Sequence, residues 1–103
     1  MKKLETKLFN AIVERVAGPD LIYLNEETIG KIRFHLAGVI VDPSKIDESL
    51  SELCRLLRRG TEVNGIMWPC GDDWEGSIYR TKQSLEGSIS YLMTSAGCLK
   101  RIR

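Results

Sequence analysis

The chain has 103 residues with 15 basic and 14 acidic side chains, which gives a formal net charge of +1. A chain of this length supports one hydrophobic core, so a single domain over residues 1–103 is predicted. Hydrophobic residues make up 43% of the sequence, which argues against disorder, and no apolar run approaches the length of a membrane span.

The first predicted element is a helix over residues 2–17. Apolar residues recur in it at every fourth position, as on the buried face of a helix. These residues are Leu4, Leu8, Ile12 and Val16. The Gly18–Pro19 pair ends the helix, because Gly favours a left-handed cap and Pro cannot continue a helix. Residues 20–24 are predicted as a short apolar link.

Two further helices are predicted between residues 25 and 60. Asn25 is a favourable N-cap, and an apolar stripe follows it until Asp42–Pro43 ends the second helix. Ser44 is typical of a capping pair that opens a third helix, which runs to Gly60. The last turn of this helix is basic, as the helix dipole favours.

Residues 61–76 interrupt the helical pattern. The Asn64–Gly65 pair predicts a tight hairpin turn inside this segment. A fourth helix is predicted over residues 77–96, because apolar residues recur at sevenfold spacing from Ile78 to Leu92. The alternation in residues 88–92 leaves a strand open as an alternative for that stretch.

The predicted fold class is therefore mainly α. Four helices pack as a small single domain, and residues 61–76 form an irregular or hairpin insertion. The alternative is an α+β domain, in which the insertion pairs with residues 20–24 or 88–93 in a small sheet.

The cysteines and the first residues predict a cytoplasmic protein. Cys54, Cys70 and Cys98 are an odd number at wide spacings, whereas secreted disulfide scaffolds usually carry an even number. Lys2 and Lys3 are not followed by the apolar segment of a secretory signal. Cys54 and Cys98 are interpreted as small core residues. No C-x-x-C pair exists, so no metal site is predicted.

No group of residues dictates a reaction, and no enzyme activity or cofactor is predicted. P-loop, dinucleotide-binding and nucleophile-elbow motifs are absent. The only histidine, His35, lies at the edge of an apolar stripe and is interpreted as structural. Asp72, Asp73 and Glu75 form one acidic cluster. It lacks the alternating ligands of an EF-hand loop and is interpreted as a solvated turn.

The segment from Met67 to Trp74 contains both tryptophans and predicts a partner-binding surface. Trp and Met are enriched at protein interfaces, and Trp dominates interaction hot spots. The predicted surface consists of Met67, Trp68, Pro69, Asp72, Asp73 and Trp74. The alternative is that both rings fold back onto the end of the bundle. A cis bond at Trp68–Pro69 is a further hypothesis, which would make the loop a substrate for a prolyl isomerase.

Basic clusters support a hypothesis of a different class, a small DNA- or RNA-binding protein. The residues that would contact nucleic acid are Arg55, Arg58, Arg59, Lys100, Arg101 and Arg103. The net charge of +1 argues against this hypothesis, because nucleic-acid-binding domains are usually strongly basic.

A resemblance to a known group of proteins rests on four features. They are the chain length, the predicted helical domain, the cytoplasmic cysteines and the loop around Trp68–Pro69. The chain resembles the small accessory proteins with which temperate phages modify host machinery, in particular the anti-RecBCD recombination modulators of lambdoid phages. The resemblance implies a non-enzymatic protein that binds and modulates or inhibits a larger host enzyme complex, such as a DNA-processing nuclease.

Overall fold

The computed structural model describes residues 6–80, 88–97 and 99–101. Within these residues the chain forms seven β-strands and two α-helices. The protein is therefore mainly β, and the predicted four-helix domain is wrong.

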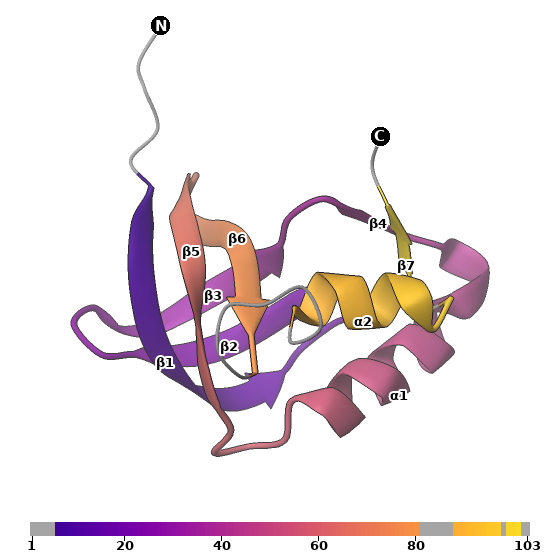
Figure 1. The fold of residues 1–103 in the computed structure, drawn as a ribbon, viewed down its shortest axis with the longest axis horizontal. Coiled ribbons are helices and arrows are strands. Elements are labelled where there is room, and N and C mark those ends of the chain that lie inside the picture. The colour runs from indigo at the N-terminus through magenta and orange to yellow at the C-terminus, as the bar shows by residue number, and fades with distance from the viewer. Residues whose placement is uncertain (1–5, 81–87, 98, 102–103) are drawn as a thin grey trace, which may run out of the picture.

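Five strands close a barrel, which occupies one side of the molecule in Figure 1. They are β1 (Lys7–Val16), β2 (Leu21–Glu26), β3 (Gly30–Leu36), β5 (Glu62–Cys70) and β6 (Asp73–Tyr79). Their order around the barrel is β1-β2-β3-β6-β5. Four neighbouring pairs are antiparallel, and the parallel pair β3–β6 completes the closure. A five-stranded Greek-key barrel is the architecture of the OB-fold.

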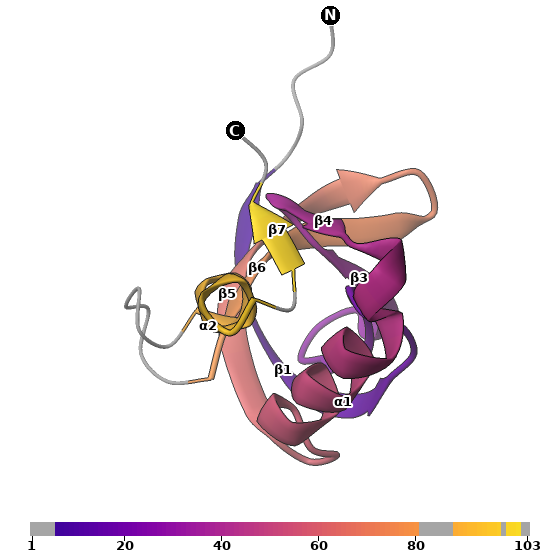
Figure 2. The ribbon, with the colours of Figure 1, turned by 90° about the vertical axis from the view of Figure 1, so that its right-hand side faces the viewer.

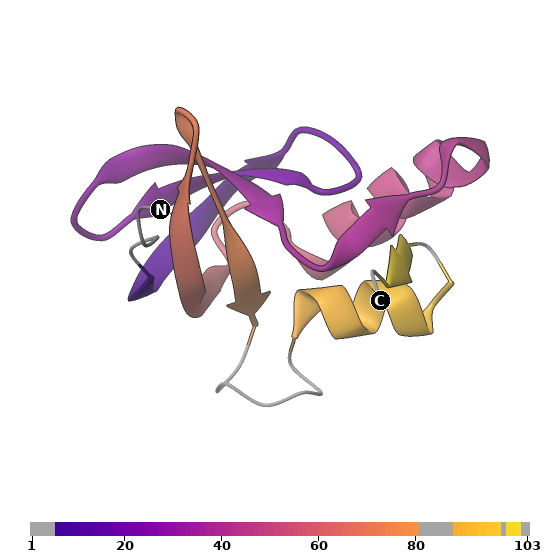
Figure 3. The ribbon, with the colours of Figure 1, turned by 90° about the horizontal axis from the view of Figure 1, so that it is seen from above.

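The other elements lie beside one end of the barrel, as Figures 2 and 3 show from two directions. They are β4 (Val39–Val41), the 3-10 helix η1 (Pro43–Lys45), α1 (Ile46–Leu56), α2 (Ile89–Ser95) and β7 (Leu99–Arg101). β4 and β7 pair antiparallel. Leu53 and Leu56 of α1 and Ile89 and Met93 of α2 join the hydrophobic core that fills the barrel. Neither described α-helix is long and apolar enough to cross a lipid bilayer.

The predicted helix over residues 2–17 is replaced by β1 over its described part. Phe9 and Val13 point into the barrel, while Leu8 and Ile12 are apolar and exposed on the outside. Leu8 and Ile12 lie four residues apart on the outer face of the strand, and this spacing also fits one face of a helix.

The predicted helix over residues 25–42 is replaced by the end of β2, by β3 and by β4. In β3, Ile32, Phe34 and Leu36 are buried, and the basic side chains between them are partly or fully exposed. This is the period-two pattern of a half-buried strand.

The segment 61–76 is a hairpin, but its turn is not at Asn64–Gly65. Gly65 is buried within β5 opposite Ile78, and the chain turns at Gly71, where φ is +63°. β5 pairs with β1, and β6 pairs with β3. The small sheet proposed as an α+β alternative, with pairing to residues 20–24 or 88–93, is therefore wrong as well.

The third predicted helix is observed, and the fourth only in part. Asp42, rather than Ser44, caps η1 by accepting a hydrogen bond from the Ser44 backbone N–H at 3.0 Å, and α1 follows until Leu56. The predicted helix over 77–96 begins inside β6, and residues 81–87 lie outside the described residues. Its C-terminal part is α2, so residues 88–92 do not form a strand.

Candidate functional site

An open groove of about 1140 Å³ lies over β1, β2 and β3 beside the C-terminal end of α1. Tyr23 and Trp74 contribute aromatic rings to its lining. Its charged residues are the basic Arg15, Lys31, Arg33, Arg58 and Arg59 and the acidic Glu14, Asp72 and Asp73. Basic residues therefore outnumber acidic residues in the groove lining, although the net charge of the whole chain is only +1.

The strand register places basic and aromatic side chains in one row across the barrel. Arg15 on β1 is opposite Tyr23 on β2, and Tyr23 is opposite Arg33 on β3. Directly opposed residues of antiparallel strands share one face of the sheet. The Arg15 guanidinium lies over the Tyr23 ring, 4.2 Å from its centroid, in a cation–π contact. Together these two groups form a platform in the groove, in which the guanidinium covers one face of the ring.

A β-bulge in β1 aims Arg15 into this row. Phe9, Ala11 and Val13 alternate inward, so regular pairing would also turn Arg15 toward the core. The register shifts between Val13 and Arg15, and Arg15 is exposed. An extra residue in one strand of a pair reverses the facing of the residues that follow. Strict alternation along β1 would have buried Arg15. The bulge instead places this cation on the outer face of the barrel.

The loop between α1 and β5 is attached to β1 at this bulge. The Val13 backbone N–H donates to the Thr61 carbonyl at 2.9 Å, and the Gly60 N–H donates to the Val13 carbonyl at 2.8 Å. These bonds hold the preceding Arg58 and Arg59 beside the groove. Both are exposed, and neither has a carboxylate at ion-pair distance within the described part of the chain. Their guanidinium groups are available to an anion.

Two other groove cations, Lys31 and Arg33, are paired with carboxylates of the same molecule. Lys31 Nζ lies 3.4 Å from Glu14 Oε2, and Arg33 Nε lies 3.6 Å from Asp73 Oδ1. Exposed pairs of this kind contribute little to stability and exchange readily with other partners.

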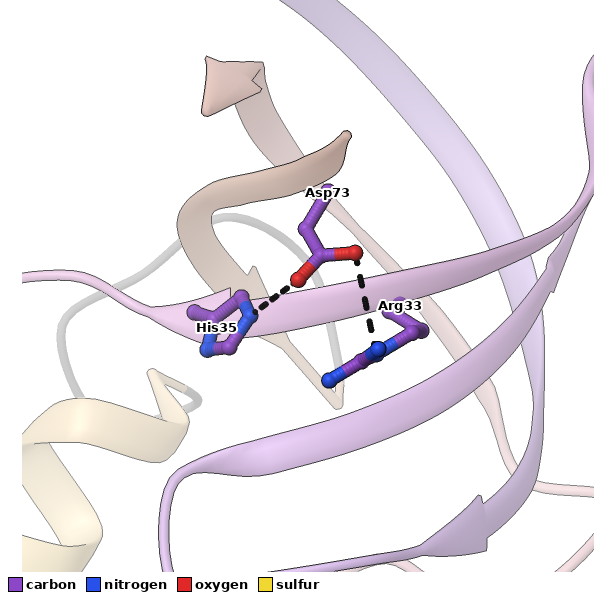
Figure 4. Close-up of polar contacts among 3 residues, drawn as sticks. All are labelled: Arg33, His35 and Asp73. Atoms are coloured by element: carbon purple, nitrogen blue, oxygen red, sulfur yellow. Dashed lines mark hydrogen bonds and ion pairs between the residues drawn. The ribbon is translucent and has the colours of Figure 1, made fainter. Parts of the chain in front are cut away.

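The carboxylate of Asp73 bridges two residues of β3, as Figure 4 shows. Its Oδ2 lies 2.9 Å from His35 Nε2, and its Oδ1 lies near the Arg33 guanidinium. His35 is half-buried and outward-facing rather than part of the core. Sequence reasoning missed this contact because it joins residues 38 positions apart.

The residues of the predicted partner-binding surface are divided between the two sides of the barrel wall. Met67 is fully buried in the core, and Trp74 packs partly against the core. The Trp68 indole N–H donates to Glu75 Oε1 at 2.9 Å. Asp73 bonds to His35, and Asp72 is exposed at the turn. The protein-binding surface stays a prediction, and Met67 offers no side-chain area to it in this structure.

The Trp68–Pro69 peptide bond is trans, contrary to the cis hypothesis. Pro69 lies in β5, where it is paired with Trp74 across the hairpin. The reason for expecting a prolyl isomerase as a partner is thereby removed.

The remaining residues proposed for nucleic-acid binding have different surroundings. Arg55 points to Glu52 on its own helix, with Nε 3.0 Å from Oε1. The hydrogen bond and the charge of this pair lower the pKa of Glu52 and raise the pKa of Arg55. Lys100 and Arg101 belong to β7, and Arg103 lies outside the described residues. Among those of the six whose side chains the structure describes, Arg58 and Arg59 line the groove and Arg55 does not.

Cys54 and Cys70 are free thiols, and both are exposed. The interpretation of Cys54 as a core residue is therefore wrong, and Cys98 lies outside the described residues. Among the described side chains, no three of the His, Cys, Asp and Glu groups lie close enough to hold a metal ion.

The turn that carries Ile29 to the groove is held by the buried Glu26. Glu26 Oε1 accepts hydrogen bonds from the backbone N–H groups of Thr28 at 2.8 Å and Ile29 at 2.6 Å. The Thr28 hydroxyl donates to Oε2 at 3.2 Å. Burial alone would raise the pKa of Glu26, but these hydrogen bonds, with the charge of Lys7, lower it below its ordinary value.

Glu26→Gln is expected to lower the free energy of unfolding by about 1.5 kcal/mol at neutral pH, because a charged acceptor is lost. A carboxyl whose pKa is lowered on folding stabilises the protein above its ordinary pKa, and the effect is lost as the pH falls through the folded value. Urea unfolding at neutral pH and near pH 3 should therefore show the wild type and the variant converging in acid. Glu27→Gln, at the exposed neighbouring position, is the matched control and should behave like the wild type.

Comparison with known proteins does not place the chain in a family. No family model matches the sequence, and no curated protein matches it. The resemblance to phage modulators of host enzymes stays a prediction.

Proposed function

We propose that this protein binds single-stranded nucleic acid in the groove over β1, β2 and β3. The observation that carries the proposal is the row of Arg15, Tyr23 and Arg33, with Arg58 and Arg59 at the same groove. Proteins that bind single strands combine a positively charged groove, which follows the backbone, with aromatic rings on which bases stack. The groove supplies both parts.

Each part of the groove has a distinct expected role. Arg58 and Arg59 are exposed and unpaired with carboxylates among the described residues, so they are expected to contact phosphates. The platform of Arg15 and Tyr23 is expected to stack a base, because bases stack on tyrosine rings and on guanidinium planes. Contacts with the nucleic-acid backbone supply the affinity, and base stacking selects strands whose bases are unpaired.

The barrel architecture supports the same location by analogy. OB-folds bind oligonucleotides and oligosaccharides over their second and third strands and the adjoining loops. Here the second and third strands carry Tyr23, Lys31 and Arg33 into the groove. A fold alone does not assign a function, so the argument depends on these side chains.

The proposal is tested by the salt dependence of oligonucleotide binding, followed by fluorescence anisotropy. The wild type is expected to bind a single strand of about 12 nucleotides at low salt, with much weaker binding to a duplex of the same sequence. Arg58→Ala/Arg59→Ala is expected to weaken binding and to reduce the slope of log affinity against log salt by about 1.4, since each lost phosphate contact removes about 0.7.

Arg55→Ala is the control, because it removes one arginine from the last turn of α1, just before the loop, at a position paired with Glu52. Its salt slope should stay close to that of the wild type. The proposal is overturned if the wild type does not bind single strands at low salt. It is also overturned if the Arg58→Ala/Arg59→Ala variant and the Arg55→Ala variant show the same small change in affinity and salt slope.

A further inference from the structure

Arg33 lines the groove, and His35, which is not part of the lining, presents a second hydrogen-bond donor beside it on β3. They are two residues apart on β3, so both project from the outer face of the barrel. Their side chains are 53% and 32% exposed, which leaves both accessible to a ligand. A phosphate oxygen is recognised by guanidinium and imidazolium donors of this kind.

An anion from the protein itself already contacts both donors. The Asp73 carboxylate gives one oxygen to His35, at 2.9 Å, and the other to Arg33, at 3.6 Å (Figure 4). A carboxylate and a phosphate use the same donors, so Asp73 stands where a backbone phosphate would bind. With neutral His35, the charges of Arg33 and Asp73 cancel, and the Glu75 carboxylate directly opposite His35 adds a negative charge, so these residues together repel an anion.

Protonation of His35 changes this balance by one positive charge. Histidine is the side chain whose charge ordinarily changes between about pH 5 and 8. The charged groups facing His35 are Arg33 on its own strand, and Asp73 and Glu75 on β6, where Glu75 is directly opposite His35. Across β2, the opposed residue is Leu21, which follows Asp20 in the turn. Glu75 also accepts the Trp68 indole hydrogen bond from β5.

We propose that Arg33 and His35 form a phosphate-binding subsite of the groove, for which the Asp73 carboxylate competes, so that the subsite gains affinity for phosphate when His35 is protonated. The inference rests on the proposed function and names one part of the same groove. It predicts that acidification strengthens binding of the nucleic-acid backbone, independently of base sequence.

The experiment measures the affinity for single-stranded oligothymidylate between about pH 8 and pH 5.5, the range in which histidine titrates and thymine does not. The wild type is expected to bind about fivefold more tightly at the acid end, with a salt slope larger by about 0.7, as for one added phosphate contact. His35 is the only histidine in the chain, so no second imidazole contributes.

Two variants separate the roles of the imidazole and the carboxylate. His35→Gln keeps an amide that can donate to Asp73 but cannot be protonated, so its affinity is expected to vary little with pH. Asp73→Asn removes the competing charge and is expected to bind about threefold more tightly than the wild type at pH 8. Circular dichroism and thermal unfolding check that both variants are folded, and either variant alone tests the proposal.

The outcomes distinguish this inference from the proposed function. If the wild type binds single strands but His35→Gln has the same pH profile as the wild type, the subsite is refuted and the groove remains. A folded Asp73→Asn variant with no gain at pH 8 refutes the competition by Asp73. Absence of oligothymidylate binding at every pH overturns the proposed function, and the subsite with it.

Discussion

Gly76→Ala is expected to lower the free energy of unfolding by about 3 kcal/mol or more, because the neighbouring strand leaves no room for a methyl group. A Cβ at this position would lie 2.0 Å from the Ile66 carbonyl oxygen and 2.8 Å from the Met67 Cα. Both atoms belong to the backbone of β5, which is paired with β1 on its other edge. The strand therefore cannot move aside without opening the barrel.

Urea unfolding followed by circular dichroism measures this effect, and Gly18→Ala is its control. A Cβ at Gly18 would meet only the Leu21 Cβ at 3.6 Å, an ordinary contact, so the change should stay within about 1 kcal/mol. The comparison also tests the fold. In the predicted helical arrangement, residue 76 precedes a helix and would accept alanine. Equal stability of the two variants would contradict the close packing of β5 against β6.

Tyr23→Leu is expected to weaken binding of a single-stranded oligonucleotide about tenfold. Stacking of a base on an aromatic side chain contributes about 1–3 kcal/mol, and 1.4 kcal/mol corresponds to tenfold in affinity. Leucine retains an apolar side chain at this half-buried position of β2, so the fold should be kept. Fluorescence anisotropy at constant low salt measures the change.

Tyr23→Phe keeps the ring without the hydroxyl and should bind within about twofold of the wild type. The salt slope of Tyr23→Leu should be unchanged, because no phosphate contact is lost. A loss of slope in Tyr23→Leu, or equal losses of affinity in both variants, would contradict a stacking role for this ring.

The sequence predicted correctly where local signals and tertiary contacts agreed. The helix after Pro43 was recognised because a cap, an apolar stripe and a basic last turn coincide, and α1 occupies Ile46–Leu56. A hairpin in residues 61–76 was also predicted, but the Asn64–Gly65 pair was taken for its turn. Gly65 instead serves a close approach, since a Cβ there would lie 2.0 Å from the Ser77 carbonyl oxygen. Glycine is favoured both in tight turns and where two strands approach closely. Only the tertiary structure shows which of the two applies to Gly65.

The strands β1 and β3 were missed for two different reasons. In β1, exposed Leu8 and Ile12 give the outer face an apolar character that imitates a helix stripe. In β3, the alternation from Lys31 to Leu36 was available in the sequence and indicates a strand. A favourable N-cap at Asn25 and the proline at position 43 bound a longer stretch that also fits a helix, and this masks the alternation.

Five residues of the candidate site were predicted from the sequence as binding residues: Arg58 and Arg59 just after α1, and Asp72, Asp73 and Trp74 in the hairpin. Arg58 and Arg59 stood out as a basic cluster, whereas Arg15, Tyr23 and Arg33 belong to three segments of ordinary composition. Their assembly depends on the strand register and on the bulge before Arg15. His35 and Asp73 meet because β3 and β6 pair in parallel, although they are distant in the chain.

By itself, the sequence determined the position of α1 and the residues available for charge and stacking. These properties follow from composition and from patterns within a few residues. Such local signals have the same effect in any tertiary fold. Only the tertiary structure decided that the chain is a barrel and that its outer face carries the groove. Strand pairing is a long-range choice: one residue of register, or one bulge, turns a side chain from the core to the solvent. Arg15 shows this most directly, because its exposure depends on a single irregularity in β1.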